Sequence, residues 1–335
     1  RGVETNVKGN YGSGAKAHQT GCINSHWIIL MPTVRLTEND KDWAFVGVIP
    51  ADAKGVTYIY GRQSCDTRSM EEGDHIDDGN AKYAGQEALM ILERVFIPWD
   101  KVFMHGEYEY ASMLIERFTC YHRRSYVCKT GLGDVLIGAA ATIADYNGVP
   151  NVSHIKDKIV EMTHLNETIF AAGIASSHLA HKLKSGVYLN EDMLAQVCKH
   201  NVTRFPYEIS RLAQDIAGGL VVTLPSEKDF RHPVAGPLLK RFLVGRKGVD
   251  VENRMRILRL IENMTLGRNS VGYLTESMHG AGSPQAQRIQ MQRQMQIGYK
   301  KNLAKKLAGI TNDIEEPSEP SGYFDRIFQT KESIL

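Results

Sequence analysis

The feature that most constrains the fold is a change of hydrophobic period near residue 105. Before it, short apolar runs rich in β-branched and aromatic residues begin at Trp27, Trp43 and Val56, and turn residues separate them. One more apolar run over 88–98 ends this part, after which apolar residues recur at helical spacing. The pattern predicts an α+β chain with a β domain over 1–105, a helical-bundle domain over 106–310 and a C-terminal arm over 311–335.

Capping residues and periodicity predict the long helices of the second domain. Ser153 can cap a helix that runs towards Lys184, and Asn190 can cap another that runs towards Ala217. An up-and-down bundle of four or five helices is the simplest packing for such a pattern. Further helices are predicted over 132–146, 251–265 and 284–308.

Composition restricts the partners and the compartment. The 335 residues carry 40 basic and 38 acidic side chains, and a net charge of +2 argues against nucleic acid as the main partner. The five cysteines are an odd number without a small-domain disulfide framework, so we expect a reducing, cytoplasmic environment. The sequence contains no run of eighteen apolar residues, so we expect no membrane partner. The chain opens on Arg1 without a signal peptide, and we expect a segment upstream of it.

One stretch, Thr119 to Lys129, gathers reactive side chains. Two thiols, an imidazole, two phenols and three cations fall within these eleven residues. His122 and Cys128 are of the types that ligate zinc or iron–sulfur centres, and Tyr126 and Lys129 can handle protons beside them. The alternative is a loop-to-helix junction with a buried cysteine, because free cysteine is usually a small core hydrophobe.

Two polar groups in the β domain are candidates for binding and catalysis. Lys16, Gln19 and Thr20 follow a glycine-rich turn and can bind a flavin ring edge or a pyrophosphate; the alternative is a polar β-turn. Glu87 stands just before an apolar strand, where a part-buried carboxylate can act as a base. The alternative for Glu87 is a solvated side chain at the start of a strand.

The second polar cluster runs from Thr275 to Gln287. Ser283 as N-cap with Pro284 at the first helical position explains part of it structurally. That explanation leaves out Glu276 and His279, which share a helical face at three-residue spacing. Further back in the chain, the pair Gly218 and Gly219 either ends a helix or belongs to a cofactor-binding turn.

Seven longer motifs carry a resemblance to a known family. They are Gly14-Ala-Lys-Ala-His-Gln-Thr-Gly, Tyr60-Gly-Arg-Gln-Ser-Cys-Asp-Thr-Arg, Tyr121-His-Arg, Gly133-Asp-Val-Leu-Ile-Gly-Ala-Ala, Glu161-Met-Thr-His-Leu-Asn-Glu-Thr, Asn201-Val-Thr-Arg-Phe-Pro-Tyr-Glu and Thr275-Glu-Ser-Met-His-Gly-Ala-Gly-Ser-Pro-Gln-Ala-Gln. Through them, and over nearly its whole length, the chain resembles the 4-hydroxyphenylacetate 3-hydroxylase family of acyl-CoA-dehydrogenase-like flavoproteins. Within that family it most resembles the 4-hydroxybutyryl-CoA dehydratases.

The resemblance implies an architecture, cofactors and partners. It implies a β-barrel-like middle domain followed by an acyl-CoA-dehydrogenase-like helical bundle, with the family's N-terminal helical domain absent from these residues. It further implies a homotetramer, built as a dimer of dimers, with FAD between subunits and an acyl-CoA thioester as substrate. In the family, three cysteines and one histidine hold a [4Fe–4S] cluster, and two of those cysteines lie in the N-terminal domain.

Carried over residue by residue, the resemblance assigns roles to positions of this chain. His122 and Cys128 correspond to cluster ligands, Tyr126 and Lys129 lie beside the substrate, Thr20 contacts the flavin, and Glu87 and Glu276 are active-site carboxylates. The loop departs from the family at Val127, which stands where the family has two glycines. Cys128 therefore follows His122 by six residues and not seven, and Cys120 is an alternative thiol.

The implied reaction is the dehydration of 4-hydroxybutyryl-CoA to crotonyl-CoA, linked to the Δ-isomerisation of vinylacetyl-CoA. It is a radical route in which FAD activates an unacidic hydrogen and iron acts as a Lewis acid on the leaving hydroxide. His122 or a neighbouring group takes the unacidic hydrogen as a proton. Glu276 and Tyr126 move protons in the isomerisation. Two alternatives stay open: a cluster-less flavin-dependent monooxygenase or isomerase of the same family, and a non-catalytic subunit.

Overall fold

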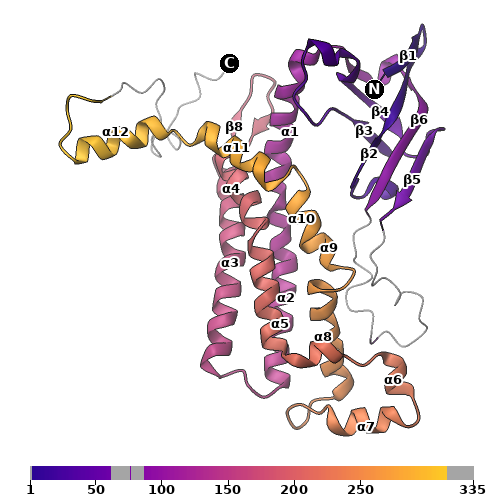
Figure 1. The fold of residues 1–335 in the computed structure, drawn as a ribbon, viewed down its shortest axis with the longest axis vertical. Coiled ribbons are helices and arrows are strands. Elements are labelled where there is room, and N and C mark those ends of the chain that lie inside the picture. Colours follow the sequence, from indigo (N-terminus) through magenta and orange to yellow (C-terminus); the bar gives the residue numbers. More distant parts are fainter. Residues whose placement is uncertain (1, 62–75, 77–86, 315–335) are drawn as a thin grey trace. The chain divides into compact units, whose positions relative to one another are not determined.

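The computed structural model describes residues 2–61, 76 and 87–314 (Figure 1). Most of the predicted C-terminal arm, most of the motif that starts at Tyr60, and the two residues before Glu87 lie outside the described residues. The chain forms two compact units. Unit 1 contains residues 1–118, 221–244 and 249–272, and unit 2 contains residues 119–220, 245–248 and 273–335.

The described residues of the β domain in unit 1 form two antiparallel sheets. The larger has the strand order β1-β2-β6-β5 and the smaller the order β3-β4-β7. The strands are β1 (Gly2–Asn6), β2 (Gly9–Lys16), β3 (Trp27–Leu30), β4 (Phe45–Pro50), β5 (Val56–Tyr60), β6 (Ala88–Pro98) and β7 (Val102–His105). The apolar runs at 27, 56 and 88–98 are thus confirmed as strands. Trp43 instead ends a 3₁₀ helix, η2 (Glu38–Trp43), and its strand starts two residues later.

Strand β6 shows how the core of this domain is formed. Its buried side chains alternate from Ala88 to Leu92 and resume at Val95 and Ile97, so the alternation slips by one residue at Arg94. Arg94 has φ +50°, and the pairing of β6 with β2 shifts register beside it, as in a β-bulge. The bulge keeps the apolar face of β6 inward, where it packs with Ile28, Leu30 and Ile49 of the smaller sheet.

The described residues of unit 1 also form helices. They are η1 (Cys22–Asn24), η5 (Trp99–Lys101), η6 (Tyr108–Tyr110), the first part of α1 (Ala111–Ser125), part of η8 (Gly219–Thr223), α6 (Glu227–Arg231), α7 (Ala235–Phe242), α8 (Val251–Thr265) and most of α9 (Ser270–Tyr273). The predicted helix over 251–265 is confirmed, with Asp250 as its N-cap. Closure of the two sheets into a barrel stays a prediction.

Unit 2 is built on helices that lie side by side in Figure 1: α2 (Lys129–Tyr146), α3 (Ser153–His178), α4 (Asp192–Val202) and α5 (Phe205–Ala217). Helix α2 packs on α3 and α5, and α3 also packs on α4. Two short strands, β8 (His181–Lys182) and β9 (Tyr188–Leu189), form a hairpin between α3 and α4. The last part of the unit holds α10 (Thr275–His279), α11 (Pro284–Gln294) and α12 (Ile297–Leu307).

Several predicted helices are wrong in their extent. Helix α3 ends at His178 and not near Lys184. The helix predicted from Asn190 is capped by Glu191, whose carboxylate accepts a hydrogen bond from the backbone N of Leu194 at 2.6 Å. It stops at Val202, and α5 starts afresh beside Pro206, because proline cannot extend a preceding helix.

The helix predicted over 284–308 is two helices. Helix α11 ends at Gln294, and Gln296, with φ +50°, lies in the left-handed region between α11 and α12. The predicted N-cap is confirmed, because Ser283 Oγ accepts a hydrogen bond from the backbone N of Ala286 at 3.3 Å. The segment 226–248, over which no helix is predicted, contains helices α6 and α7.

The stretch Thr119 to Lys129 is helical throughout, with η7 (Tyr126–Cys128) between α1 and α2. It belongs to a longer stretch, Tyr108–Tyr146, that is long and apolar enough by length and composition alone to cross a membrane. Leu136, Ala140 and Ile143 of α2 are fully buried in unit 2. Burial of this kind is typical of the core helix of a helical bundle.

Candidate active site

A carboxylate with two hydrogen-bond donors lies at the centre of the candidate site in unit 2. Glu276 Oε1 accepts a hydrogen bond from Tyr126 Oη at 2.8 Å, and Glu276 Oε2 accepts one from Lys129 Nζ at 2.7 Å. The side chains of Lys129 and Glu276 are each 14% exposed. A part-buried carboxylate between a phenol and an ammonium is suited to proton transfer. A proton that moves a short way along either hydrogen bond changes the charge of the carboxylate.

Local helix geometry explains why Tyr126 and Lys129 reach the same carboxylate. Tyr126 begins the 3₁₀ turn η7 and Lys129 begins α2, so the two side chains are three residues apart in continuous helix and lie on one side of it. Glu276 comes from α10. Through Glu276, the structure thus brings the polar cluster that starts at Thr275 into contact with the stretch Thr119 to Lys129.

Gly280 leaves the space in which the phenol meets the carboxylate. A Cβ atom built on Gly280 would lie 1.7 Å from Tyr126 Oη and 3.0 Å from Glu276 Oε1. The backbone of Gly280, with φ −59° and ψ 145°, is open to any residue, so the requirement for glycine is one of space.

His122 lies one helical turn before Tyr126. The two ring centroids are 5.4 Å apart. Burial lowers the pKa of His122, and the nearby Lys199 and Arg123 act in the same direction, whereas Glu276 opposes them. The imidazole is therefore held in its neutral form, which is the form that accepts a proton or ligates a metal.

Sequence reasoning missed Lys199, a fully buried residue of α4. Its Nζ lies 4.0 Å from the centroid of the Tyr126 ring and donates hydrogen bonds to the carbonyl oxygens of Ser277 and, at 3.5 Å, Met278. Burial is the main cause that lowers the pKa of Lys199 to about 7. Lys199 lies on the buried stripe of α4 that includes Ala195, Cys198 and Val202. A lysine at helical spacing among apolar residues is visible in the sequence and could have indicated a buried cation.

A second missed group holds the turn after α10. The guanidinium of Arg123, itself buried, donates through Nε to the carbonyl oxygen of Ala281 at 3.0 Å and through Nη1 to Gln196 Oε1 at 2.6 Å. Gln196 Nε2 in turn donates to Asp192 Oδ1 at 2.6 Å. Ala281 has φ +58°, a strained conformation for a non-glycine residue, and Arg123 stabilises it.

The candidate cluster ligands form only part of a metal site. His122 is near enough to Glu276 for the carboxylate to act on its pKa. The thiol of Cys128 is exposed. Burial raises the pKa of Cys120, whose Sγ donates to the carbonyl oxygen of Asn190 at 3.3 Å, so its thiol stays protonated. Within residues 2–61, 76 and 87–314, no three His, Cys, Asp or Glu side chains are grouped so that they could hold a metal ion. These residues alone do not fit a four-ligand cluster.

In unit 1 the structure brings together Thr20 and Glu87, which are 67 residues apart. Thr20 Oγ1 lies 2.7 and 3.0 Å from the two carboxylate oxygens of Glu87 and donates to them. The backbone N of Gln19 donates to the carbonyl oxygen of Ala88 at 2.9 Å, which fixes this turn on the start of β6. The side chain of Gln19 bonds locally, to the carbonyl oxygen of Ala17 at 2.9 Å.

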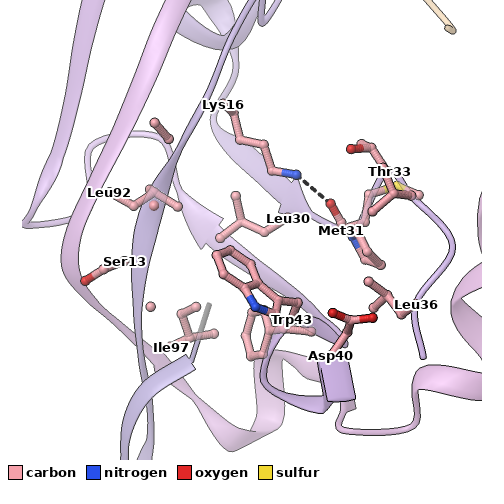
Figure 2. Close-up of a pocket in the computed structure, with 16 residues that line it drawn as sticks. Ser13, Lys16, Leu30, Met31, Thr33, Leu36, Asp40, Trp43, Leu92 and Ile97 are labelled. Atoms are coloured by element: carbon pink, nitrogen blue, oxygen red, sulfur yellow. Dashed lines mark hydrogen bonds between the residues drawn. The ribbon is translucent and has the colours of Figure 1, made fainter. Parts of the chain in front are cut away.

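Lys16 points into a cavity of about 370 Å³ in unit 1 (Figure 2). Its Nζ donates to the carbonyl oxygen of Met31 at 2.7 Å, and burial lowers its pKa. Figure 2 shows the indole of Trp43 and the side chain of Leu30 beside it. The other lining residues are Gly12, Ser13, Gly14, Ala15, Met31, Pro32, Thr33, Val34, Leu36, Asp40, Phe45, Leu92 and Ile97.

Gly218 is the C-cap of α5, with φ +78°, and Gly219 starts η8. The interpretation of this pair as a helix end is confirmed, because φ in the left-handed region is the usual reason for glycine at such a position. Their role in cofactor binding stays a prediction.

The chain matches two family descriptions. 4-Hydroxyphenylacetate 3-hydroxylase N terminal matches residues 1–104, and 4-hydroxyphenylacetate 3-hydroxylase C terminal matches residues 111–309. A curated relative from Clostridium aminobutyricum, 4-hydroxybutyryl-CoA dehydratase/vinylacetyl-CoA-Delta-isomerase, is 55% identical over 317 residues, which cover 92% of this chain and 65% of the relative.

Solved structures give the same picture. An oxygen-tolerant archaeal 4-hydroxybutyryl-CoA dehydratase from N. maritimus is 88% identical, with a TM-score of 0.95 over 99% of this chain and 66% of that one. The oxygenase component of 4-hydroxyphenylacetate 3-monooxygenase, solved with FAD, is 22% identical with a TM-score of 0.80 over 92% of this chain and 64% of that one, and shares the fold. The chain thus spans about two thirds of the length of these relatives. It belongs to the 4-hydroxyphenylacetate 3-hydroxylase family.

Proposed function

We propose that this chain carries catalytic residues of a 4-hydroxybutyryl-CoA dehydratase that also isomerises vinylacetyl-CoA to crotonyl-CoA. The observation that carries the proposal is the contact of Glu276 with both Tyr126 and Lys129 in a part-buried site. The identity of 55% to a relative named for both activities supports it. A monooxygenase activity has weaker support, since the curated monooxygenases are 22–24% identical.

The isomerisation requires one proton to leave C2 of vinylacetyl-CoA and one to be added at C4. The C2 hydrogen is acidified by the thioester, so a positioned carboxylate can act as the base that removes it. In our proposal Glu276 takes the C2 proton and returns a proton to C4, while Tyr126 and Lys129 hold the two oxygens of Glu276 in place. No water or redox equivalent is consumed in this step.

The dehydration is harder, because the hydrogen at C3 of 4-hydroxybutyryl-CoA is not acidified by the thioester. When bound, FAD supplies redox chemistry that lowers this barrier. The exposed hydroxyl of Thr20 donates its hydrogen to the carboxylate of Glu87, so the pair presents acceptor oxygens, which fit an N–H donor at the edge of a flavin ring. The neutral imidazole of His122 is the group that we assign to the C3 proton.

A [4Fe–4S] cluster enters the proposal only through its ligands. His122 and Cys128 supply an imidazole and a thiol of the right chemistry, but the described residues do not gather a complete donor set. We therefore assign no step to the cluster on this chain. The homotetrameric assembly, the acyl-CoA partner and the cytoplasmic location likewise remain predictions.

The proposal is tested with the full-length protein, purified without oxygen and assayed for flavin, iron and turnover. We expect bound FAD and the conversion of both 4-hydroxybutyryl-CoA and vinylacetyl-CoA to crotonyl-CoA. A flavin-loaded protein that converts neither thioester but hydroxylates a phenol with reduced flavin and oxygen would assign it to the monooxygenases. A protein that binds neither FAD nor acyl-CoA would be a non-catalytic subunit.

A further inference from the structure

Lys199 is the one fully buried lysine among the described residues of unit 2, and the reaction as proposed does not use it. Its ammonium group has lost its hydration, which is costly unless other groups replace the water. In the part of the chain that the structure describes, no carboxylate forms an ion pair with Lys199 Nζ; its contacts are two backbone carbonyl oxygens and one aromatic ring. An apolar side chain of similar size would fill the same volume at lower cost.

The two carbonyl oxygens belong to Ser277 and Met278, near the C-terminal end of α10. Helix α10 has five residues, too few to be stable by itself, and the last carbonyls of a helix lack partners within the helix. A cation at this end satisfies those oxygens and also interacts favourably with the helix dipole. Because Glu276 directly precedes Ser277, a bond to Ser277 also fixes the backbone from which the Glu276 carboxylate extends.

The third contact of the same ammonium is with the partner of that carboxylate. Lys199 Nζ lies 4.0 Å from the centroid of the Tyr126 ring, a distance at which cation–π attraction is favourable. Tyr126 Oη donates to Glu276 Oε1 at 2.8 Å. One ammonium thus holds the backbone beside the carboxylate and the ring of the phenol, and so closes a loop of contacts through residues from α4, η7 and α10.

We propose that Lys199 is a positioning residue that sets the geometry of the Glu276–Tyr126 pair for proton transfer. The inference rests on the proposed function for the identity of the reaction and on the contacts above for the geometry. Among the described residues, Lys199 Nζ donates to backbone carbonyl oxygens and not to the Tyr126 hydroxyl or the Glu276 carboxylate. Its removal is therefore expected to slow turnover while the binding of thioester and flavin stays as it is.

The first test compares three variants of the full-length, anaerobically purified protein in the isomerisation of vinylacetyl-CoA. Lys199→Met keeps the volume and removes the charge. Lys199→Gln keeps N–H donors for a carbonyl oxygen and serves as the test variant if Lys199→Met does not fold. The matched control is Lys158→Met, which removes an ion pair with Asp215 at 2.7 Å in the same unit. Lys158 lies about 22 Å along α3 from Gly173, which contacts Val127 of η7.

We expect kcat of Lys199→Met to fall about 10²-fold, with KM and FAD content close to those of the wild type, because a displaced proton-transfer group loses about that much. Lys199→Gln should lose less, and Lys158→Met should match the wild type. As a conservative rescue, n-propylamine replaces the side chain missing from Lys199→Ala and should raise its kcat saturably, whereas 1-propanol should not. A folded Lys199→Met with wild-type kcat would overturn the proposal.

The second test measures backbone hydrogen exchange and needs no turnover. In Lys199→Met or Lys199→Gln, peptides that cover 275–280 should exchange faster than in the wild type, with the rest of unit 2 unchanged. Loss of kcat without faster exchange there, or faster exchange spread over the whole unit, would overturn a positioning role. If the wild type converts neither thioester, the proposed function fails, and the exchange result alone decides the role of Lys199.

Discussion

Tyr126 and Glu276 are 150 residues apart in the sequence, and the phenol of one donates a 2.8 Å hydrogen bond to the carboxylate of the other. The contact joins the turn between α1 and α2 to the short helix α10. Lys129 binds the second oxygen of the same carboxylate, so both oxygens are occupied and their orientation is fixed. Preorganisation of this kind is what a proton-transfer group requires, since the geometry is set before the substrate binds.

Replacement of the carboxylate is the simplest test of its role. Glu276→Gln keeps the shape and hydrogen-bonding positions but removes the base, and we expect kcat for vinylacetyl-CoA isomerisation to fall by about 10²- to 10⁴-fold. The matched control is Glu208→Gln, whose carboxylate is also bound by a cation, Arg211 at 2.7 Å, but lies on the exposed surface. Steady-state kinetics of both variants checks this, and equal losses in the two would refute it.

Gly280 is predicted to be required for space. In Gly280→Ala the added Cβ would overlap Tyr126 Oη, so the bond between Tyr126 and Glu276 must break or α10 must move. We expect the isomerase rate to drop at least about tenfold, since small misplacement of a reacting group costs up to about 10²-fold.

The control for this substitution is Gly138→Ala in α2, where the structure has no atom within 4 Å of the added Cβ. It should keep its activity and unfold at a slightly higher temperature, because alanine is favoured over glycine inside a helix by about 1 kcal/mol. Wild-type activity in Gly280→Ala would mean that the contact is dispensable.

The packing of α2 on α3 depends on a second glycine. A Cβ on Gly133 would lie 2.1 Å from Asn166 Oδ1 and would displace the side chain that donates to Thr130 O at 3.1 Å and Asp134 Oδ1 at 2.8 Å. We expect Gly133→Ala to lower the free energy of unfolding by about 1–3 kcal/mol, as overpacking usually does. Urea unfolding of Gly133→Ala and of the control Gly138→Ala checks the prediction. Equal free energies of unfolding in the two variants would contradict it.

Burial of Lys199 predicts a pH dependence of stability. Its pKa falls from 10.5 to about 7 on folding, so between these values the unfolded chain binds more protons than the native one. The cost of burying the charge is full below pH 7 and is relieved as the pH rises. Stability relative to Lys199→Met should therefore increase with pH, by at most about 1.4 kcal/mol per pH unit. Parallel stabilities of the two proteins from pH 7 to pH 9, measured by urea unfolding, would contradict this.

Local pattern was enough to predict much of the fold. The change from alternating to helical periodicity separated the strands before residue 105 from the long helices, and α8 begins and ends where capping and period place it. The break before α5 was also readable, because Pro206 has no backbone N–H to donate and is therefore favoured in the first turn of a helix, where it stands in α5. The break at Gln296 had no such signal, since glutamine has no special preference for a left-handed backbone.

The sequence pointed to the residues that form the candidate site, but not to the residues that hold them in position. Tyr126, Lys129 and Glu276 stand in motifs rich in reactive side chains, and the structure brings them together. Lys199 was visible only as a cation on a buried helical stripe, and its role depends on which backbone carbonyls face it. Which residues Arg123 and Gly280 contact depends on the tertiary structure, so one sequence alone does not reveal it.

In the proposed reaction Glu276 transfers protons at C2 and C4 of an acyl-CoA thioester. Crotonyl-CoA incubated in D₂O with the full-length, flavin-loaded enzyme tests it most directly, because exchange at the C4 methyl group reports reverse isomerisation without dehydration. We expect the wild type to introduce deuterium at C4 and Glu276→Gln, with the same FAD content, to do so at least about 10²-fold more slowly. Absence of exchange with the wild type, or equal rates in the two proteins, would contradict it.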